Sequence, residues 1–441
     1  MTKPNLFSDF QQVSAKAWKQ KIQMDLKGAD YNKTLLNSTL EGITVKPFYH
    51  DDSYKSLAIP VVSKSASICH TLFINDEKIV NNISKEVLKK GAESIRFIAK
   101  KTFDYKQVFQ KLPKKTSYLL FCDFLDTNFV KELLDYAKDI DLKIIIDPIH
   151  HFVADGNWFN SQEEDFKIVN NKAITIGIDA TLYQNAGANI VQQIAYALAH
   201  ANEYLNAGSQ QDFIFTFSVG SNYFFEIAKI RAFRYLIKKV LTKYDIDAKV
   251  EIILEPTLRN KTLYDYNVNL LRTTTESMSA MLSGVDFISN TPYDSIYHRT
   301  NEFGSRIARN QLLVLKEESY FNKKEDLAKG SYYIEQITYE LANIALELFK
   351  DIEKNGGFLA QIKKGTIQRK IEESANKEQK LFDTGELVLL GTNKYPNEKD
   401  KMKADLELYP FVKTKPRKTI VKPIIPRRLA EKAERNRLDS E

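Results

Sequence analysis

The sequence has few features that would cross-link, anchor or export the chain. It contains two cysteines, Cys69 and Cys122, and both lie inside apolar runs, so we expect reduced thiols in a core. No apolar run approaches the ~20 residues needed to cross a bilayer. The first residues lack the apolar centre and small-residue cleavage pattern of a secretory signal. These absences predict a cytoplasmic protein without a membrane partner.

Sequence motifs of the common catalytic and cofactor sites are also missing. There is no Walker loop, no glycine-rich dinucleotide loop, no G-x-S-x-G elbow and no D-x-H-x-x-G signature for a cobalamin-ligating histidine. The six histidines form neither an i, i+4 pair nor a cluster with cysteines, so we expect no metal site. His150 and His151 are adjacent, and we expect them in a loop rather than as a ligand pair.

The positive charge is concentrated at one end of the chain. Residues 413–441 hold ten Lys or Arg against four Asp or Glu, which accounts for nearly all of the net charge of +7. A basic, proline-rich tail could contact RNA or an acidic partner. It has no interleaved aromatic residues on which bases could stack, so we expect no nucleic-acid partner and a tail that is solvated or wraps a protein.

Eight short apolar runs alternate with longer amphipathic segments in the middle of the chain. Runs that are apolar on both faces are typical of parallel strands covered by helices. Eight successive strand–helix units predict a (β/α)₈ TIM barrel, and a doubly wound open sheet is the alternative. The runs are 68–75, 94–99, 117–123, 142–148, 173–179, 212–220, 249–256 and 285–290.

Polar residues at the carboxyl ends of these runs predict a polar barrel mouth, where barrel enzymes keep their chemistry. Most are also good caps for the following helix, so they indicate no specific reaction. They are Asn75, Asp123, Asp147, Asp179, Ser218, Glu255 and Asn290. Around the barrel we expect an N-terminal arm (1–65), a helical block that completes the barrel domain (66–380), and a C-terminal extension with the basic tail (381–441).

Two long segments carry a family resemblance. They read FSVGSNYFFEIAKIRAFRYL at 217–236 and DYNVNLLRTTTESMSAMLSGVDFISNTPYD at 265–294, and the similarity continues through FGSRIARNQLLVLKEES at 303–319. The arm and the stretch RRLAEKAERNR match in the same order. The chain resembles the adenosylcobalamin-dependent acyl-CoA mutases, and methylmalonyl-CoA mutase in particular, over nearly its whole length.

The resemblance implies which residues would act in a catalytic member. There the CoA ester lies along the barrel axis, a flavodoxin-like domain brings cobalamin, and a tyrosine and a histidine position the acyl group. In this chain Thr181 and Leu182 occupy those two positions, so we expect no catalytic residue here. The segment with the carboxylate-binding arginine has no counterpart, and we expect no cobalamin domain. Arg272 and Glu276 keep the R-T-x-x-E spacing, whose glutamate faces the cofactor in catalytic relatives, and they are the candidate cofactor-binding residues.

The absence of the family's tyrosine, histidine, arginine segment and cobalamin domain predicts an accessory, non-catalytic subunit of a heteromeric mutase. We expect this chain to be inactive alone. Its partner in a heterodimer would be a cobalamin-bearing large subunit that holds adenosylcobalamin and the acyl-CoA substrate, and the arm and tail would wrap that subunit. Two alternatives stay open. The chain could be the catalytic barrel of a split mutase with a separate cobalamin subunit, or a binding protein without enzymatic function.

Overall fold

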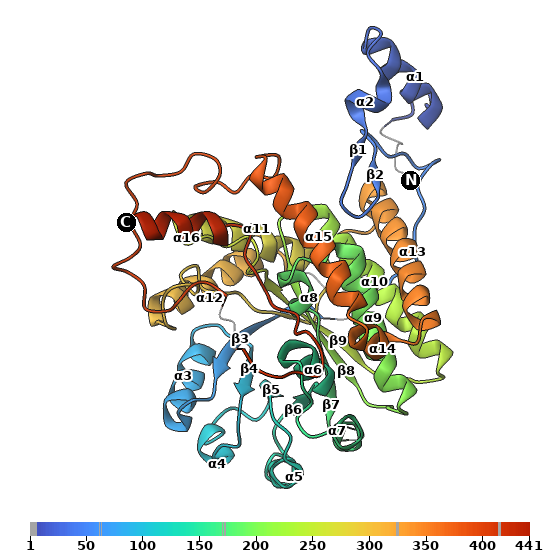
Figure 1. Ribbon diagram of the computed structural model, residues 1–441. Helices are drawn as coiled ribbons and strands as arrows, with labels where there is room; N and C mark the ends of the chain where they lie inside the picture. Colours follow the sequence, from blue (N-terminus) through green and yellow to red (C-terminus); the bar gives the residue numbers. More distant parts are fainter. Residues whose placement is uncertain are drawn as a thin grey trace.

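The computed structural model describes residues 7–60, 62, 64–169, 171, 173–322, 326–412 and 416–441, without the side chain of residue 168. Eight parallel strands close into a barrel, because β10 pairs with both β9 and β3 (Figure 1). The predicted (β/α)₈ barrel is therefore confirmed, and the open-sheet alternative was wrong. The strands are β3 (Ser67–Phe73), β4 (Ser94–Ala99), β5 (Ser117–Cys122), β6 (Leu142–Ile146), β7 (Thr175–Asp179), β8 (Phe213–Val219), β9 (Val250–Pro256) and β10 (Phe287–Ile288).

Helices of very different length connect the strands and form the outer ring. Those after β7, β8 and β9 are the longest, and their inner faces are buried against the strands. The helices are α3 (Glu77–Lys89), α4 (Tyr105–Val108), α5 (Thr127–Tyr136), α6 (Pro148–Asp155), α7 (Gln162–Val169), α8 (Thr181–Asn185), α9 (Ile190–Asn206), α10 (Tyr223–Lys243), α11 (Val268–Leu282) and α12 (Glu302–Leu313), which a π-helical turn extends.

The two adjacent histidines lie on a helix, so the expectation of a loop was wrong. Asp147 caps α6 by accepting a hydrogen bond from the His150 N–H, and Pro148 stands at the first helical position. An acidic cap followed by proline is a strong helix start, since the proline lacks the N–H that would otherwise be unpaired there.

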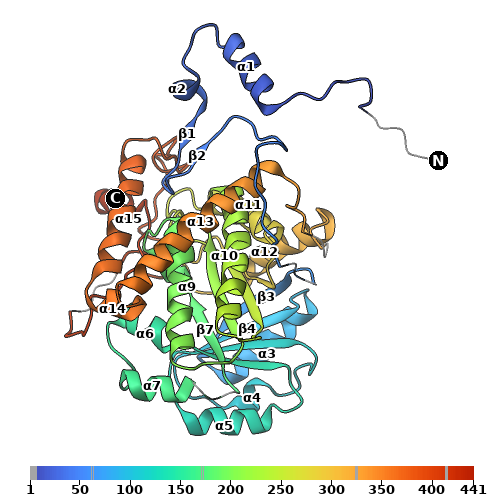
Figure 2. The ribbon, with the colours of Figure 1, turned by 90° about the vertical axis from the view of Figure 1, so that its right-hand side faces the viewer.

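The N-terminal arm stands away from the barrel (Figures 1 and 2). It consists of α1 (Ala15–Asp25), α2 (Tyr31–Leu35) and a small hairpin of β1 (Asn37–Ser38) and β2 (Thr44–Val45). Its root crosses α13 (Tyr332–Lys354), where Tyr49 packs against Tyr333 and Tyr54 against Tyr332 at ring-centroid distances of 5.1 and 4.6 Å. These aromatic contacts hold the segment at Tyr49 and Tyr54 against α13. The helix α1, by contrast, has no buried residue.

Three helices and an irregular segment complete the C-terminal part beside the barrel mouth. They are α14 (Phe358–Lys363), α15 (Thr366–Asp383) and α16 (Glu431–Ser440). The helix α15 packs closely on the turn between α8 and α9, where Gly187 has φ +105° and an added Cβ would meet the Cβ of Ala375 at 2.4 Å. Only glycine fits this position, since it combines a left-handed backbone with close approach.

Residues 416–429, which we call the strap, lie along this chain's own barrel mouth. This placement differs from the expected tail wrapped around a partner, and residues 413–415 of that tail are outside the described residues. Backbone hydrogen bonds tie the strap to α6, to α8 and to the loop after β9. They run from the N–H groups of Ile420 and Val421 to Gly156 O, Ile424 to Val153 O, Arg427 to Asn185 O and Leu429 to Arg259 O, at 2.8–3.2 Å.

Candidate functional site at the barrel mouth

The turn after β7 forms one edge of the mouth. It is the short helix α8, whose five residues are all buried. Thr181 donates its hydroxyl hydrogen to Asp179 Oδ1 at 2.6 Å and its N–H to the same oxygen at 2.9 Å. Leu182 is 5% exposed and lines the mouth cavity. Because the threonine hydrogen is already used and leucine has none to donate, neither side chain can hold a substrate carbonyl.

A buried polar network lies behind this turn. Tyr183 Oη and His200 Nδ1 are 2.9 Å apart, and His200 Nε2 lies 2.9 Å from Asp147 Oδ1. Tyr204 donates to the same oxygen at 2.8 Å. The carboxylate of Asp147 is buried, which disfavours its charge, but His200 beside it outweighs burial and lowers the pKa of Asp147. Every member has a partner, so the network fixes α8 and α9 to the end of β6.

His150 borders the mouth among three carboxylates. Its Nδ1 lies 4.0 Å from Asp179 Oδ2. Burial of the ring lowers the pKa of His150, but Asp179, Asp147 and Asp123 outweigh it, so the pKa is raised above the ordinary value. The protonated imidazole is therefore favoured by folding.

The raised pKa of His150 predicts a pH dependence of stability. A group with a raised pKa in the folded chain stabilises it fully below its unfolded pKa, about 6.5, and the stabilisation is lost as the pH rises through the folded pKa. We expect the free energy of unfolding of the full chain to exceed that of His150→Asn at pH 5.5, with the difference shrinking toward pH 8.5. Urea unfolding at several pH values measures it, and a pH-independent difference would contradict the assignment.

The barrel lumen is filled by side chains. Six buried apolar residues from six strands pack against one another across the axis, namely Cys69, Leu119, Ile145, Ile214, Ile253 and Phe287. Ion pairs lie at both ends of this layer: Lys143 with Glu251 at the amino ends of the strands, and Arg96 with Glu255 toward the mouth, at 2.5 Å. Among the described residues, the axis is thus occupied by protein atoms.

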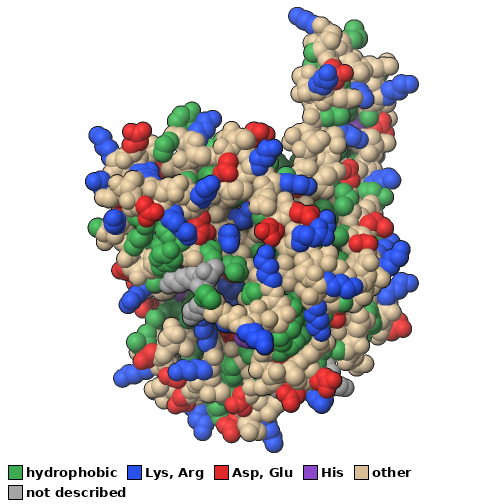
Figure 3. Space-filling model, viewed as in Figure 1, with side chains coloured by type: hydrophobic (Ala, Val, Ile, Leu, Met, Phe, Trp, Pro, Cys, Tyr) green, Lys and Arg blue, Asp and Glu red, His purple; other side chains and the backbone are tan. Residues whose placement is uncertain are grey.

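A cavity of about 620 Å³ remains between the lumen and the strap. Its floor carries Leu182, Thr181 and Glu255, and its roof is the proline-containing strap. The positively and negatively charged side chains on this face of the molecule are interspersed (Figure 3). The strap crosses the mouth in front of α6 (Figure 1). We call this cavity the mouth chamber.

Comparison with known proteins identifies the architecture around the mouth. The family profile described as methylmalonyl-CoA mutase matches residues 138–435, which include the strands from β6 to β10, the strap and part of α16. The chain belongs to the methylmalonyl-CoA mutase family. Within that family, the methylmalonyl-CoA mutase small subunit of Porphyromonas gingivalis is 32% identical over 90% of this chain and 72% of its own length.

Other members of the mutase family match a smaller part of the chain. The methylmalonyl-CoA mutase of Cereibacter sphaeroides is 33% identical over 62% of this chain and 38% of its own length. The large subunit of the Porphyromonas gingivalis enzyme is 29% identical over 62% of this chain and 38% of its own length. The chain thus spans well under half of these two relatives. Among the described residues, no helix is long and apolar enough to cross a membrane.

The two candidate cofactor-binding residues of the mutase pattern lie on α11 and point into the protein. Glu276 is 1% exposed and pairs with Lys261 Nζ at 2.7 Å, while Asn260 donates to it at 2.6 Å. Arg272 donates to Thr262 Oγ1 and to the carbonyl of Leu390 at 2.8 and 2.7 Å. Both are committed to contacts inside this chain, so as placed they do not fit contact with a corrin.

Sequence reasoning missed the charged residues of the lumen. Arg96, Lys143 and Glu251 stand inside apolar strand runs and share the strand face of Ile98, Ile145 and Ile253. In a strand, residues two apart point to the same side. A charge at such a position inside a buried run signals an internal ion pair.

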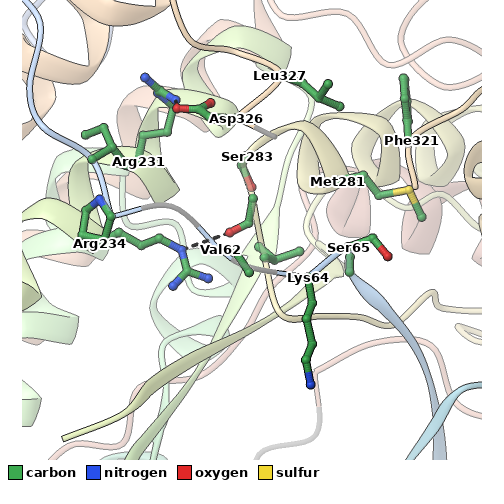
Figure 4. A pocket seen from close by; sticks show the side chains of 15 residues that line it. Val62, Lys64, Ser65, Arg231, Arg234, Met281, Ser283, Phe321, Asp326 and Leu327 are labelled. Atoms are coloured by element: carbon green, nitrogen blue, oxygen red, sulfur yellow. Dashed lines mark hydrogen bonds and ion pairs between the residues drawn. The ribbon is translucent and has the colours of Figure 1, made fainter. Parts of the chain in front are cut away.

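A second cavity, of about 30 Å³, lies near the amino ends of the strands (Figure 4). Arg231 at its edge pairs with Asp326 and with Glu335, and Arg234 pairs with Asp286 at 2.6 Å. The space suffices for about one or two water molecules. With its arginines neutralised, it is a packing feature that holds α10 to the segment before α13.

Proposed function

We propose that the chain is the small, accessory subunit of a heteromeric methylmalonyl-CoA mutase. The complex would interconvert methylmalonyl-CoA and succinyl-CoA, with the chemistry on a large subunit. The observation that carries the proposal is the turn at Thr181 and Leu182, which is followed by the A-G-A sequence of the mutase turn and offers no donor for a substrate carbonyl. Losing one preorganised donor typically costs about 10²–10³ in rate.

The filled lumen supports the same assignment. A CoA ester along the axis would have to displace the apolar layer of Leu119, Ile145 and Phe287, and separate the buried Arg96 from its partner Glu255. Breaking a buried pair leaves an uncompensated charge and costs several kcal/mol. Substrate and adenosylcobalamin therefore belong on the partner in this proposal, and the cofactor there supplies the radical chemistry. The same cost argues against the split-enzyme alternative.

The arm carries the surface that we propose contacts the large subunit. Phe7, Phe10 and Met24 are 71–75% exposed, and Trp18 is 50% exposed. Apolar side chains at this density are unusual on a free surface and typical of an interface. We further propose that Arg272 and Glu276 brace the rim of the barrel.

The proposal predicts that restoring one catalytic side chain leaves the chain inactive. Leu182→His would return the family histidine, but the filled lumen and the missing arginine would still exclude the substrate. We expect no conversion of methylmalonyl-CoA by purified Leu182→His supplied with adenosylcobalamin, measured by chromatography of the CoA esters. Turnover by this variant alone would contradict an accessory role.

The decisive experiment isolates the chain from its own cells with whatever it binds. We expect a one-to-one complex with a larger chain, and corrinoid absorbance in the eluate, by native mass spectrometry and spectroscopy. A complex with only a small cobalamin-binding chain would favour a split enzyme. An eluate without corrinoid would overturn the assignment and favour a binding protein outside mutase chemistry.

A further inference from the structure

A cavity of about 340 Å³ lies between the hairpin of the N-terminal arm and the barrel, and we call it the hairpin cavity. Its volume is at the lower end of the range of about 300–1,000 Å³ typical of ligand pockets. Residues 37–41 of the arm form one wall, and the start of α9, the loops after β8 and β9 and the helix α15 form the others. The hairpin cavity shares no lining residue with the mouth chamber, so the two are separate sites.

Four charged side chains line the hairpin cavity, and three of them already have ionic partners. Arg259 and Glu378 pair with each other, and Glu226 pairs with Lys229, which is fully buried behind the wall. The fourth, Glu41, forms no ion pair among the described residues. The cavity therefore carries one carboxylate without a counter-ion.

The neighbours of Glu41 place its carboxyl group at the wall of the cavity. It accepts hydrogen bonds from the Thr39 hydroxyl and from backbone N–H groups, that of Ile190 among them, and the charge of Glu226 repels it. Thr39, Ile190 and Glu226 all line the cavity. Burial and this repulsion outweigh the hydrogen bonds, so the pKa of Glu41 is raised. A cation in the cavity would offset both effects, because it stabilises the ionised carboxylate.

The turn that carries Glu41 is held in place before any ligand arrives. The N–H of Gly42 donates to the carbonyl of Thr39 at 3.1 Å and closes the turn. The Asn189 side chain, at the start of α9, donates to the carbonyl of Leu40 at 3.2 Å and ties the turn to the barrel. A carboxylate positioned in this way loses little conformational entropy when it binds a cation.

The remaining wall determines which kind of cation fits. A metal ion such as Ca²⁺ or Mg²⁺ takes about six or more oxygen ligands, whereas Glu41 supplies the only unpaired carboxylate of the cavity. An ammonium group needs fewer partners and can carry a hydrocarbon chain, which gains free energy by leaving water. Six apolar side chains are available to that chain: Leu40, Ile190, Leu381, Leu387, Leu389 and Leu429.

We infer that the hairpin cavity binds a small aliphatic ammonium ion, with its ammonium group paired to Glu41 and its alkyl chain against the leucines. Because Glu41 belongs to the arm and the opposite walls belong to the barrel and α15, the bound ion connects the arm to the barrel. The inference concerns a ligand of this chain itself and does not depend on the proposed subunit role.

Three probes of similar shape and different charge test the inference. They are n-pentylammonium, pentan-1-ol and pentanoate, which are cationic, neutral and anionic at neutral pH. Saturation-transfer NMR titrations on the full chain, in the state in which it is purified, give the three dissociation constants. We expect n-pentylammonium to bind at least about tenfold more tightly than either of the others, since only it can donate to the carboxylate as an ion. Equal affinities, or no saturation transfer from n-pentylammonium, would overturn the inference.

A charge-removing variant tests the role of Glu41. Glu41→Gln keeps the shape of the side chain and should weaken n-pentylammonium about tenfold, while pentan-1-ol binds as before. Glu163→Gln, at an exposed position on α7 outside the cavity, makes the same change in net charge and should alter neither affinity. Unchanged n-pentylammonium binding by Glu41→Gln would refute the assignment of the counter-ion.

A cavity-filling variant locates the binding. Ser374 is partly exposed on α15 and lines the cavity, so Ser374→Trp should fill the space and abolish binding of n-pentylammonium. Asn376→Trp, at an exposed position of the same helix outside the cavity, is the matched control and should bind as before. Equal binding by Ser374→Trp and the parent chain would place the ligand elsewhere and overturn the inference.

Discussion

Glu276→Gln should lower the free energy of unfolding of the chain by about 3–5 kcal/mol, because it leaves the Lys261 ammonium buried without its counter-ion. Burial already lowers the pKa of Lys261 and raises the pKa of Glu276, and their mutual attraction opposes both shifts. Urea unfolding at neutral pH measures the loss. The double variant Lys261→Met/Glu276→Gln should recover most of it, since no charge is then left unpaired and Asn260 keeps an acceptor.

A surface pair provides the control for this prediction. Glu373 on α15 pairs with Arg369 at 2.6 Å, but both side chains are about half exposed. Glu373→Gln should leave the urea concentration at the unfolding midpoint nearly unchanged, because water screens an exposed ion pair. If Glu276 instead served a cofactor, Glu276→Gln would leave stability nearly unchanged and lower the corrinoid content of the complex. That result would contradict the bracing role.

Replacing Phe10 and Trp18 with serine should weaken the proposed complex with a large subunit by about a thousandfold. Each of these arm side chains is at least half exposed in the free chain, so the substitutions remove apolar contact area without opening the core. Burying a large apolar side chain contributes about 1.5–3 kcal/mol, and two such losses give this factor. Analytical ultracentrifugation or surface plasmon resonance with the large subunit measures it.

The matched control lies on the opposite side of the barrel. Ile79 on α3 is 56% exposed and distant in sequence from the arm. Ile79→Ser should leave the affinity unchanged, and both variants should unfold at the same urea concentration as the parent chain. An unaltered affinity of the Phe10→Ser/Trp18→Ser variant would mean that the arm is not part of the interface.

The barrel was predictable because its signals are local and repeated. Each strand is a continuous apolar run, and each run is followed by a helical period or a capping residue such as Asp147 or Asp126. The barrel signals depend on neighbours in sequence, which single-sequence reasoning can read. The turn at Thr181 and Leu182 was located differently, through the resemblance to the mutases, whose turn shares the A-G-A sequence at residues 186–188. The structure adds that Gly187 in this sequence has a left-handed backbone and a close contact with Ala375.

The site chemistry was less predictable because it depends on pairing across the fold. Arg96 and Glu255 lie 159 residues apart, and their ion pair becomes evident only when β4 and β9 face each other across the lumen. The position of the strap over the barrel mouth could not be predicted for the same reason. A proline-rich basic segment has no periodicity, and its hydrogen bonds to Gly156 and Asn185 span more than 240 residues.

These long-range bonds impose an order on folding during synthesis. The strap leaves the ribosome after all eight strands, so the barrel can close first, while its mouth is still uncovered. The arm emerges before any strand of the barrel and is available to a partner throughout. Bringing the strap back to α6 requires the closure of a very long loop, and such contacts form late. We therefore expect the strap to cover the mouth only after the barrel has closed, so that a newly made chain passes through a stage in which the barrel is closed and its mouth is open.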